Sequence, residues 1–114
     1  MADMQIKIGD RGTVKVVELV GPITLGSGDL KVRETIKELV SGGHQKIVLD
    51  LGEVPFMDST GIGELVAAYT SARNRGATLK LARLTRRIKD ILDIAQLSAV
   101  FESYESVEEA IVSF

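Results

Sequence analysis

The segment KIVLDLGEVPFMDSTGIGELVAAYTSARNRGATLKLA, residues 46–82, decides the fold because it holds a strand, a helix and a second strand in succession. Residues 46–51 form a short apolar run typical of a deeply buried strand. Residues 60–75 carry apolar side chains at helical spacing, and Gly76 follows as a stop signal. Residues 77–82 alternate apolar and polar, as a half-buried strand does. This order predicts a parallel crossover unit within an α/β sheet.

The sequence on either side extends this unit. Two β-rich runs, residues 4–9 and 13–20, flank a turn signal at residues 10–12, which predicts an antiparallel hairpin. Apolar spacing and capping residues predict the remaining elements, which are a helix over residues 29–41, a helix capped by Thr85, a short strand at Val100 and Phe101, and a helix opened by Ser106. We expect one α/β domain over residues 1–114, in which the hairpin leads into a mostly parallel sheet of about five strands packed with about four helices.

Composition excludes several classes of function. The 114 residues carry a formal net charge of -2 and 4% aromatic residues, so no nucleic-acid partner is expected. Cys is absent and His44 is the single His, so no cofactor or metal site is expected. No apolar run reaches the ~18 residues of a membrane helix, and the N-terminus lacks a signal-peptide pattern. We therefore expect a cytoplasmic domain with no membrane insertion.

The motif DSTGIG, residues 58–63, lies where a loop after the buried strand meets the next helix. Asp, Ser and Thr all cap helices well, but a single cap accounts for only one of the three. Each glycine in the helix costs about 1 kcal/mol relative to Ala, which suggests that another surface or another chain approaches this backbone. Both a capped helix start and a functional site remain open on these residues alone.

The sequence lacks the other residues that an enzymatic interpretation of this motif would require. A nucleophile elbow requires Gly where Met57 stands, and a serine nucleophile requires a base, for which His44 is the only His. Residues 21–28, GPITLGSG, have part of the spacing of a phosphate loop but lack the Lys-Ser/Thr pair that binds phosphate and Mg²⁺. A nucleotide-binding domain stays an alternative, while a mobile strand-to-helix connection is the simpler interpretation of this segment.

Charge is segregated along the second half of the chain. Residues 65–89 contain seven cations and no acid, whereas residues 90–114 contain six acids and no cation. These blocks either solvate two faces or steer a protein partner by electrostatic attraction.

The segment over residues 46–82 resembles the core of the STAS domain, the fold shared by bacterial anti-sigma factor antagonists and the tails of sulphate transporters. The signature is a hydrophobic strand ending in Asp-Leu, here Asp50 and Leu51, followed by Asp-Ser-Ser/Thr-Gly-hydrophobic-Gly at the start of a helix. The resemblance continues to SVEEA at residues 106–110 and so spans nearly the whole chain.

The resemblance implies an anti-sigma factor antagonist that is a kinase substrate and not an enzyme. In that family the Ser after the motif's Asp is phosphorylated by the anti-sigma factor, itself a serine kinase, so Ser59 is the implied acceptor and Thr60 a second candidate. The unphosphorylated antagonist binds the anti-sigma factor and frees the sigma factor, and a metal-dependent serine phosphatase reverses the modification. The implied partner-binding residues are Asp58, Ser59, Thr60, Gly61, Ile62 and Gly63.

Other members of this fold imply a second interpretation. In it the chain is an unphosphorylated scaffold or regulatory subunit of a larger stress-signalling or lipid-transport complex. Ser59 would then only cap its helix.

Overall fold

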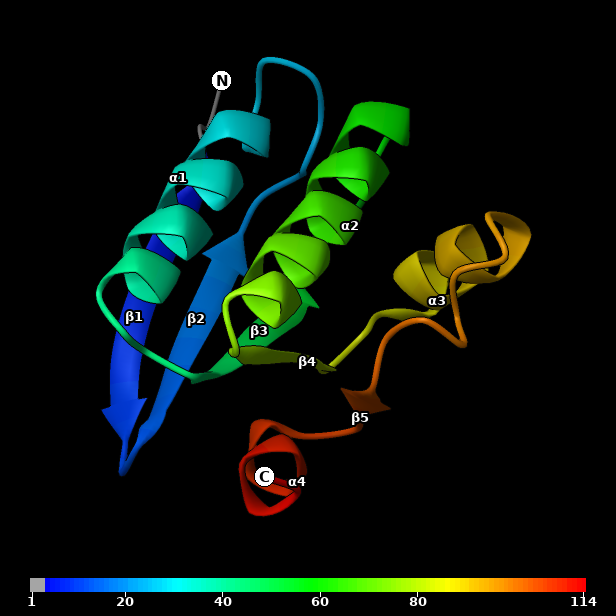
Figure 1. Ribbon diagram of the computed structural model, residues 1–114. Coiled ribbons are helices and arrows are strands. Elements are labelled where there is room, and N and C mark those ends of the chain that lie inside the picture. The colour runs from blue at the N-terminus through cyan, green and yellow to red at the C-terminus, as the bar shows by residue number, and fades with distance from the viewer. Residues whose placement is uncertain (1–3) are drawn as a thin grey trace.

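Five strands form one sheet in the order β1-β2-β3-β4-β5 in the computed structural model, which describes residues 4–114 (Figure 1). The strands are β1 (Gln5–Arg11), β2 (Val14–Val20), β3 (Lys46–Glu53), β4 (Thr78–Ala82) and β5 (Ser103–Tyr104). β1 and β2 pair antiparallel, and every later pair is parallel. The predicted hairpin and mostly parallel α/β sheet are confirmed.

The helices cover the two faces of this sheet unequally. They are α1 (Asp29–Ser41), α2 (Ser59–Asn74), α3 (Arg86–Ile94) and α4 (Val107–Val112). α1 and α2 lie side by side over one face, and α4 lies on the other (Figure 1). β3 shows this division, because Ile47 and Leu49 face the main core with α1 and α2, whereas Val48 packs with Ala110 of α4. No helix within residues 4–114 is long and apolar enough to cross a membrane.

The expected last strand at Val100 and Phe101 is wrong. Val100 lies in a turn, where its N–H donates to the Leu97 carbonyl at 3.0 Å. Phe101 is buried and meets the Tyr69 ring edge to face, with the ring centroids 5.3 Å apart. The strand begins later because Phe101 is used as a core anchor, and only residues 103–104 pair with β4.

Candidate functional site

The loops that follow β2 and β3 meet at one edge of the sheet. Because these two strands are parallel, their carboxyl ends lie together, which is where open α/β sheets commonly place their sites. The Ile23 N–H donates to the Phe56 carbonyl at 3.1 Å, so the loop after β2 is fixed to the loop that leads into α2. The motif at residues 58–63 therefore sits beside residues 21–28.

Asp58 fixes this junction from the N-cap position of α2. One carboxylate oxygen, Oδ1, accepts the Gly61 N–H at 2.8 Å, and the other, Oδ2, accepts the Leu25 N–H at 3.0 Å. These bonds, that from Leu25 first and that from Gly61 next, hold the pKa of Asp58 below its ordinary value of 3.8. Asp58 is therefore ionised at neutral pH and joins the two loops.

Ser59 is exposed at the first position of α2. Within residues 4–114, its hydroxyl makes no hydrogen bond in the structure, because Asp58 supplies the cap. Thr60 is only half-buried, and Ile62 packs partly against the main core. The suggestion that Ser59 merely caps the helix is therefore wrong, and its hydroxyl is free for another use.

The two glycines of the motif differ in their surroundings. Gly61 is buried, and an ideal Cβ there would lie 1.8 Å from the carbonyl oxygen of Ile23. Gly63 is exposed, with nothing within 4 Å of an added Cβ. The surface that approaches Gly61 is thus this chain's own β2–α1 loop, and only Gly63 leaves the backbone open to a partner.

The loop over residues 21–28 does not form a phosphate cradle. Five of its amide groups already donate within the chain, from Gly21 to the Glu53 carbonyl, from Ile23 to Phe56, from Thr24 to Ser27, from Leu25 to Asp58 and from Ser27 to Thr24. The Asp58 carboxylate also lies against the loop and would repel a phosphate. The same bonds tie the segment to the neighbouring loop, so the geometry argues against the nucleotide-binding alternative.

Exposed apolar side chains flank Ser59, and the sequence patterns did not single them out. Leu25 is 74% exposed in the loop bonded to Asp58, and Phe56, three residues before Ser59, is 38% exposed. The Arg87 guanidinium lies over the Phe56 ring, 5.1 Å from its centroid. Two features of the sequence could have indicated these exposed side chains, namely a leucine within a Gly/Ser-rich loop and a phenylalanine directly after Pro55.

Asp50 of the Asp-Leu signature serves the sheet and not this loop cluster. Its buried carboxylate accepts Arg83 Nε at 2.8 Å and the Gly52 N–H at 3.0 Å. The hydrogen bond to Asp50 is the main reason why the pKa of Arg83 is raised, and Glu18 lies 3.7 Å from the same guanidinium. The Arg83 side chain covers Gly52, whose missing Cβ leaves room for it.

The two charge blocks partly neutralise each other. Three cations of residues 65–89 pair with acids of residues 90–114, in the pairs Lys80–Glu102, Arg86–Asp90 and Lys89–Glu105. These contacts favour the interpretation in which the blocks solvate the domain itself. Within residues 4–114, no group of three or more His, Cys, Asp and Glu is placed to hold a metal ion.

Comparison with known protein families identifies the family to which this chain belongs. The model of the STAS domain matches residues 5–110. The chain belongs to the STAS domain family. The anti-sigma-B factor antagonist of Listeria monocytogenes is 43% identical to this STAS chain over 72 residues. That alignment covers 63% of each chain, so the match spans less than two thirds of the relative's length.

Solved structures share the STAS fold. An anti-sigma factor antagonist from Mycobacterium paratuberculosis superposes with a TM-score of 0.86 at 20% identity, over 97% of this chain and 93% of that one. The Bacillus cell fate determinant SpoIIAA in its phosphorylated form superposes with a TM-score of 0.70 at 19% identity, over 96% and 97% of the two chains. At these identities the likeness establishes the architecture of the STAS domain alone.

Proposed function

We propose that this STAS domain is an anti-sigma factor antagonist that binds an anti-sigma factor kinase while Ser59 is unmodified and releases it once Ser59 is phosphorylated. The observation that carries the proposal is the exposed, unbonded Ser59 hydroxyl at the start of α2, beside an Asp58 that already supplies the helix cap. The name of the Listeria relative and the phosphorylated form of SpoIIAA support it.

The position of Ser59 suits a phosphate acceptor. A kinase must reach the hydroxyl oxygen, and Ser59 is exposed whereas Thr60 is half-buried. Modification need not disturb the helix cap, because the Asp58 carboxylate holds the Gly61 N–H at 2.8 Å. A phosphate at a helix N-terminus also interacts favourably with the helix dipole. We therefore expect the domain to stay folded when it is modified.

The switch would act on the partner. Asp58 contributes one negative charge, and phosphorylation of the adjacent Ser59 adds about 1.5 to 2 more at neutral pH. A docked protein must desolvate this charge or face it with its own carboxylates. A penalty on the order of 3 kcal/mol weakens binding about a hundredfold.

The apolar rim around Ser59 would provide the contact area. Leu25 and Phe56 expose large side chains close to the acceptor, and Gly63 presents open backbone on the first turns of α2. Well-placed apolar and aromatic residues commonly dominate interface energetics. Ile62, at the rim of the core, would complete this surface.

The acceptor is tested by mass spectrometry. The full chain is incubated with ATP and each serine-kinase anti-sigma factor of its host, then measured intact and by peptide mapping. We expect one added phosphoryl group on Ser59 in the wild type and in Thr60→Val, and none in Ser59→Ala. A phosphoryl group that persists in Ser59→Ala would assign the acceptor elsewhere.

The switch itself is tested by affinity for the same anti-sigma factors. We expect Ser59→Asp to weaken binding at least tenfold, whereas Thr70→Asp, an exposed position further along α2, leaves it near the wild-type value. If no kinase modifies the chain and Ser59→Asp binds as tightly as the wild type, the proposal is overturned in favour of the scaffold interpretation.

A further inference from the structure

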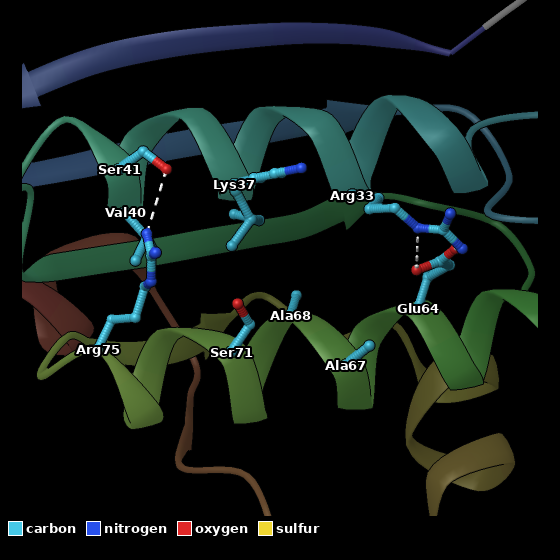
Figure 2. Close-up of a pocket in the computed structure, with 10 residues that line it drawn as sticks. Arg33, Lys37, Val40, Ser41, Glu64, Ala67, Ala68, Ser71 and Arg75 are labelled. Carbon is cyan, nitrogen blue, oxygen red and sulfur yellow. Dashed lines mark hydrogen bonds and ion pairs between the residues drawn. The ribbon is translucent and has the colours of Figure 1, made fainter.

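A groove of about 530 Å³ runs between α1 and α2, on the side of these helices that faces away from the sheet (Figure 2). The buried side chains of Ile36, Val40 and Ala68 contribute apolar surface to it. Volumes of this size lie within the range of about 300–1,000 Å³ typical of small-molecule sites. We call this feature the α1–α2 groove, and it is separate from the Ser59 loop cluster.

Side-chain bridges close both ends of the α1–α2 groove. At one end Arg33 of α1 makes a two-point ion pair with Glu64 of α2, with Nε 3.1 Å from Oε1. At the other end Arg75 Nη1 donates to Ser41 Oγ at 3.3 Å, and both bridges are visible in Figure 2. The eight-residue span from Arg33 to Ser41 corresponds to about 12 Å of helix. A partner helix lying along the groove would have to displace both bridges, so a short ligand fits better.

The lining of the groove carries more cations than carboxylates. Glu64 pairs with Arg33, and Glu34 and Glu38 share an adjoining hollow with Lys37, whereas within residues 4–114 Arg75 has no carboxylate within 4.0 Å. The Ser71 hydroxyl points into the groove near Arg75, and the Lys37 side chain runs along α1 toward the Arg33 end (Figure 2). The Arg75 guanidinium and the Ser71 hydroxyl above an apolar floor are complementary to one anionic group attached to an apolar body.

We propose that the α1–α2 groove binds a free amphiphilic monocarboxylate with a short unbranched hydrocarbon body. The carboxylate accepts hydrogen bonds from Arg75, since a planar carboxylate matches the fork of a guanidinium, and the Lys37 ammonium adds electrostatic attraction from further along α1. The hydrocarbon lies along Val40, Ile36 and Ala68 toward the Arg33–Glu64 bridge, where it removes apolar surface from water. This site is independent of phosphorylation at Ser59.

The proposal is tested by titrating ¹⁵N-labelled full chain with sodium octanoate and following amide shifts. We expect the changes to map to residues 33–41 and 64–75. Acetate lacks the apolar body and octanol lacks the charge, so each should bind at least fivefold more weakly than octanoate. Changes centred elsewhere, or none at about 10 mM octanoate, roughly ten times a millimolar Kd, overturn the proposal.

Matched variants separate the head-group site from general charge. The double variant Lys37→Ala/Arg75→Ala should weaken octanoate binding about tenfold or more, as expected for lost charge-assisted hydrogen bonds. Lys46→Ala removes an exposed cation outside the groove and should leave the affinity within about twofold. An equal loss in Lys46→Ala, or octanol binding as tightly as octanoate, contradicts the assigned head-group site.

A second pair of variants tests the apolar floor. Ala67 lines the groove and is exposed on α2, so Ala67→Leu fills the groove with a good helix former and should abolish octanoate-induced shifts. Thr70→Leu adds a similar side chain to the same helix outside the groove lining and should retain them. Unchanged binding in Ala67→Leu would place the ligand elsewhere.

Discussion

The carbonyl oxygen of Ile23 occupies the space in which a Cβ on Gly61 would lie, only 1.8 Å from the ideal Cβ position. The contact joins the loop after β2 to the first turn of α2, where the Asp58 carboxylate already bonds both segments. Backbone cannot move aside as a flexible side chain can. The position of Ser59 therefore depends on a glycine that is not itself exposed.

Gly61→Ala is expected to lower the free energy of unfolding by about 3 kcal/mol, at the upper end of the usual cost of overpacking. Gly63→Ala is the matched control, because nothing lies within 4 Å of an added Cβ there. Removal of a helical glycine should stabilise that variant by about 0.5–1 kcal/mol. Urea denaturation of both variants measures these changes, and a Gly61→Ala protein as stable as the wild type contradicts the close approach.

The stability contribution of Asp58 should depend on pH in the acidic range. The folded-state pKa of Asp58 is lowered from 3.8, so the unfolded chain binds the proton more readily. The contribution is then fully present above 3.8 and is lost as the pH falls through the lower folded-state pKa. We expect Asp58→Asn to differ most from the wild type at neutral pH, with the difference shrinking below 3.8.

Two measurements check this pH dependence. An NMR titration of the Asp58 carboxyl carbon gives its folded-state pKa directly, and urea unfolding at several pH values compares the wild type with Asp58→Asn. A pKa of Asp58 at or above 3.8 would contradict the observed bonds from the Leu25 and Gly61 amides.

Arg83→Ala is expected to destabilise the domain by about 2 kcal/mol, because it leaves the Asp50 carboxylate buried without its cation. This expected destabilisation is smaller than that for a fully buried ion pair, because the Arg83 side chain is 40% exposed and partly screened by solvent. Arg73→Ala, an exposed cation of α2, is the control and should change stability by less than about 0.5 kcal/mol. Equal effects of the two substitutions would argue against a structural role for the Asp50–Arg83 pair.

Leu25→Ala and Phe56→Ala should each weaken binding of the anti-sigma factor about tenfold while leaving the unfolding midpoint nearly unchanged. Both side chains are exposed near Ser59, so truncation removes contact area without opening the core. Ile94→Ala provides the matched control, since Ile94 is 84% exposed at the last residue of α3, whereas Arg87, which lies over Phe56, is in the first turn of that helix. Isothermal titration calorimetry measures all three, and equal affinities throughout would remove the apolar rim from the interface.

Much of the fold follows from local patterns in the sequence. Alternation and helical spacing predicted the hairpin, the parallel crossovers and the helix over residues 29–41, which is observed as Asp29–Ser41. Thr85 and Ser106 cap their helices as predicted, by accepting the Ile88 and Glu109 amides. These features depend on residues a few positions apart, so a single segment carries enough information to specify them. The motif at residues 58–63 was recognisable for the same reason.

Tertiary structure decided how those segments are used. It bonded the second carboxylate oxygen of the Asp58 cap to the amide of Leu25, 33 residues earlier, and so joined the loop after β2 to the start of α2 beside Ser59. It turned Phe101 from a predicted strand residue into a core residue against Tyr69. Contacts of this kind arise only once the parallel crossover brings the ends of β2 and β3 to one edge and sets α1 beside α2. Sequence determined the elements, and their packing determined which polar groups are occupied and which remain available to a partner.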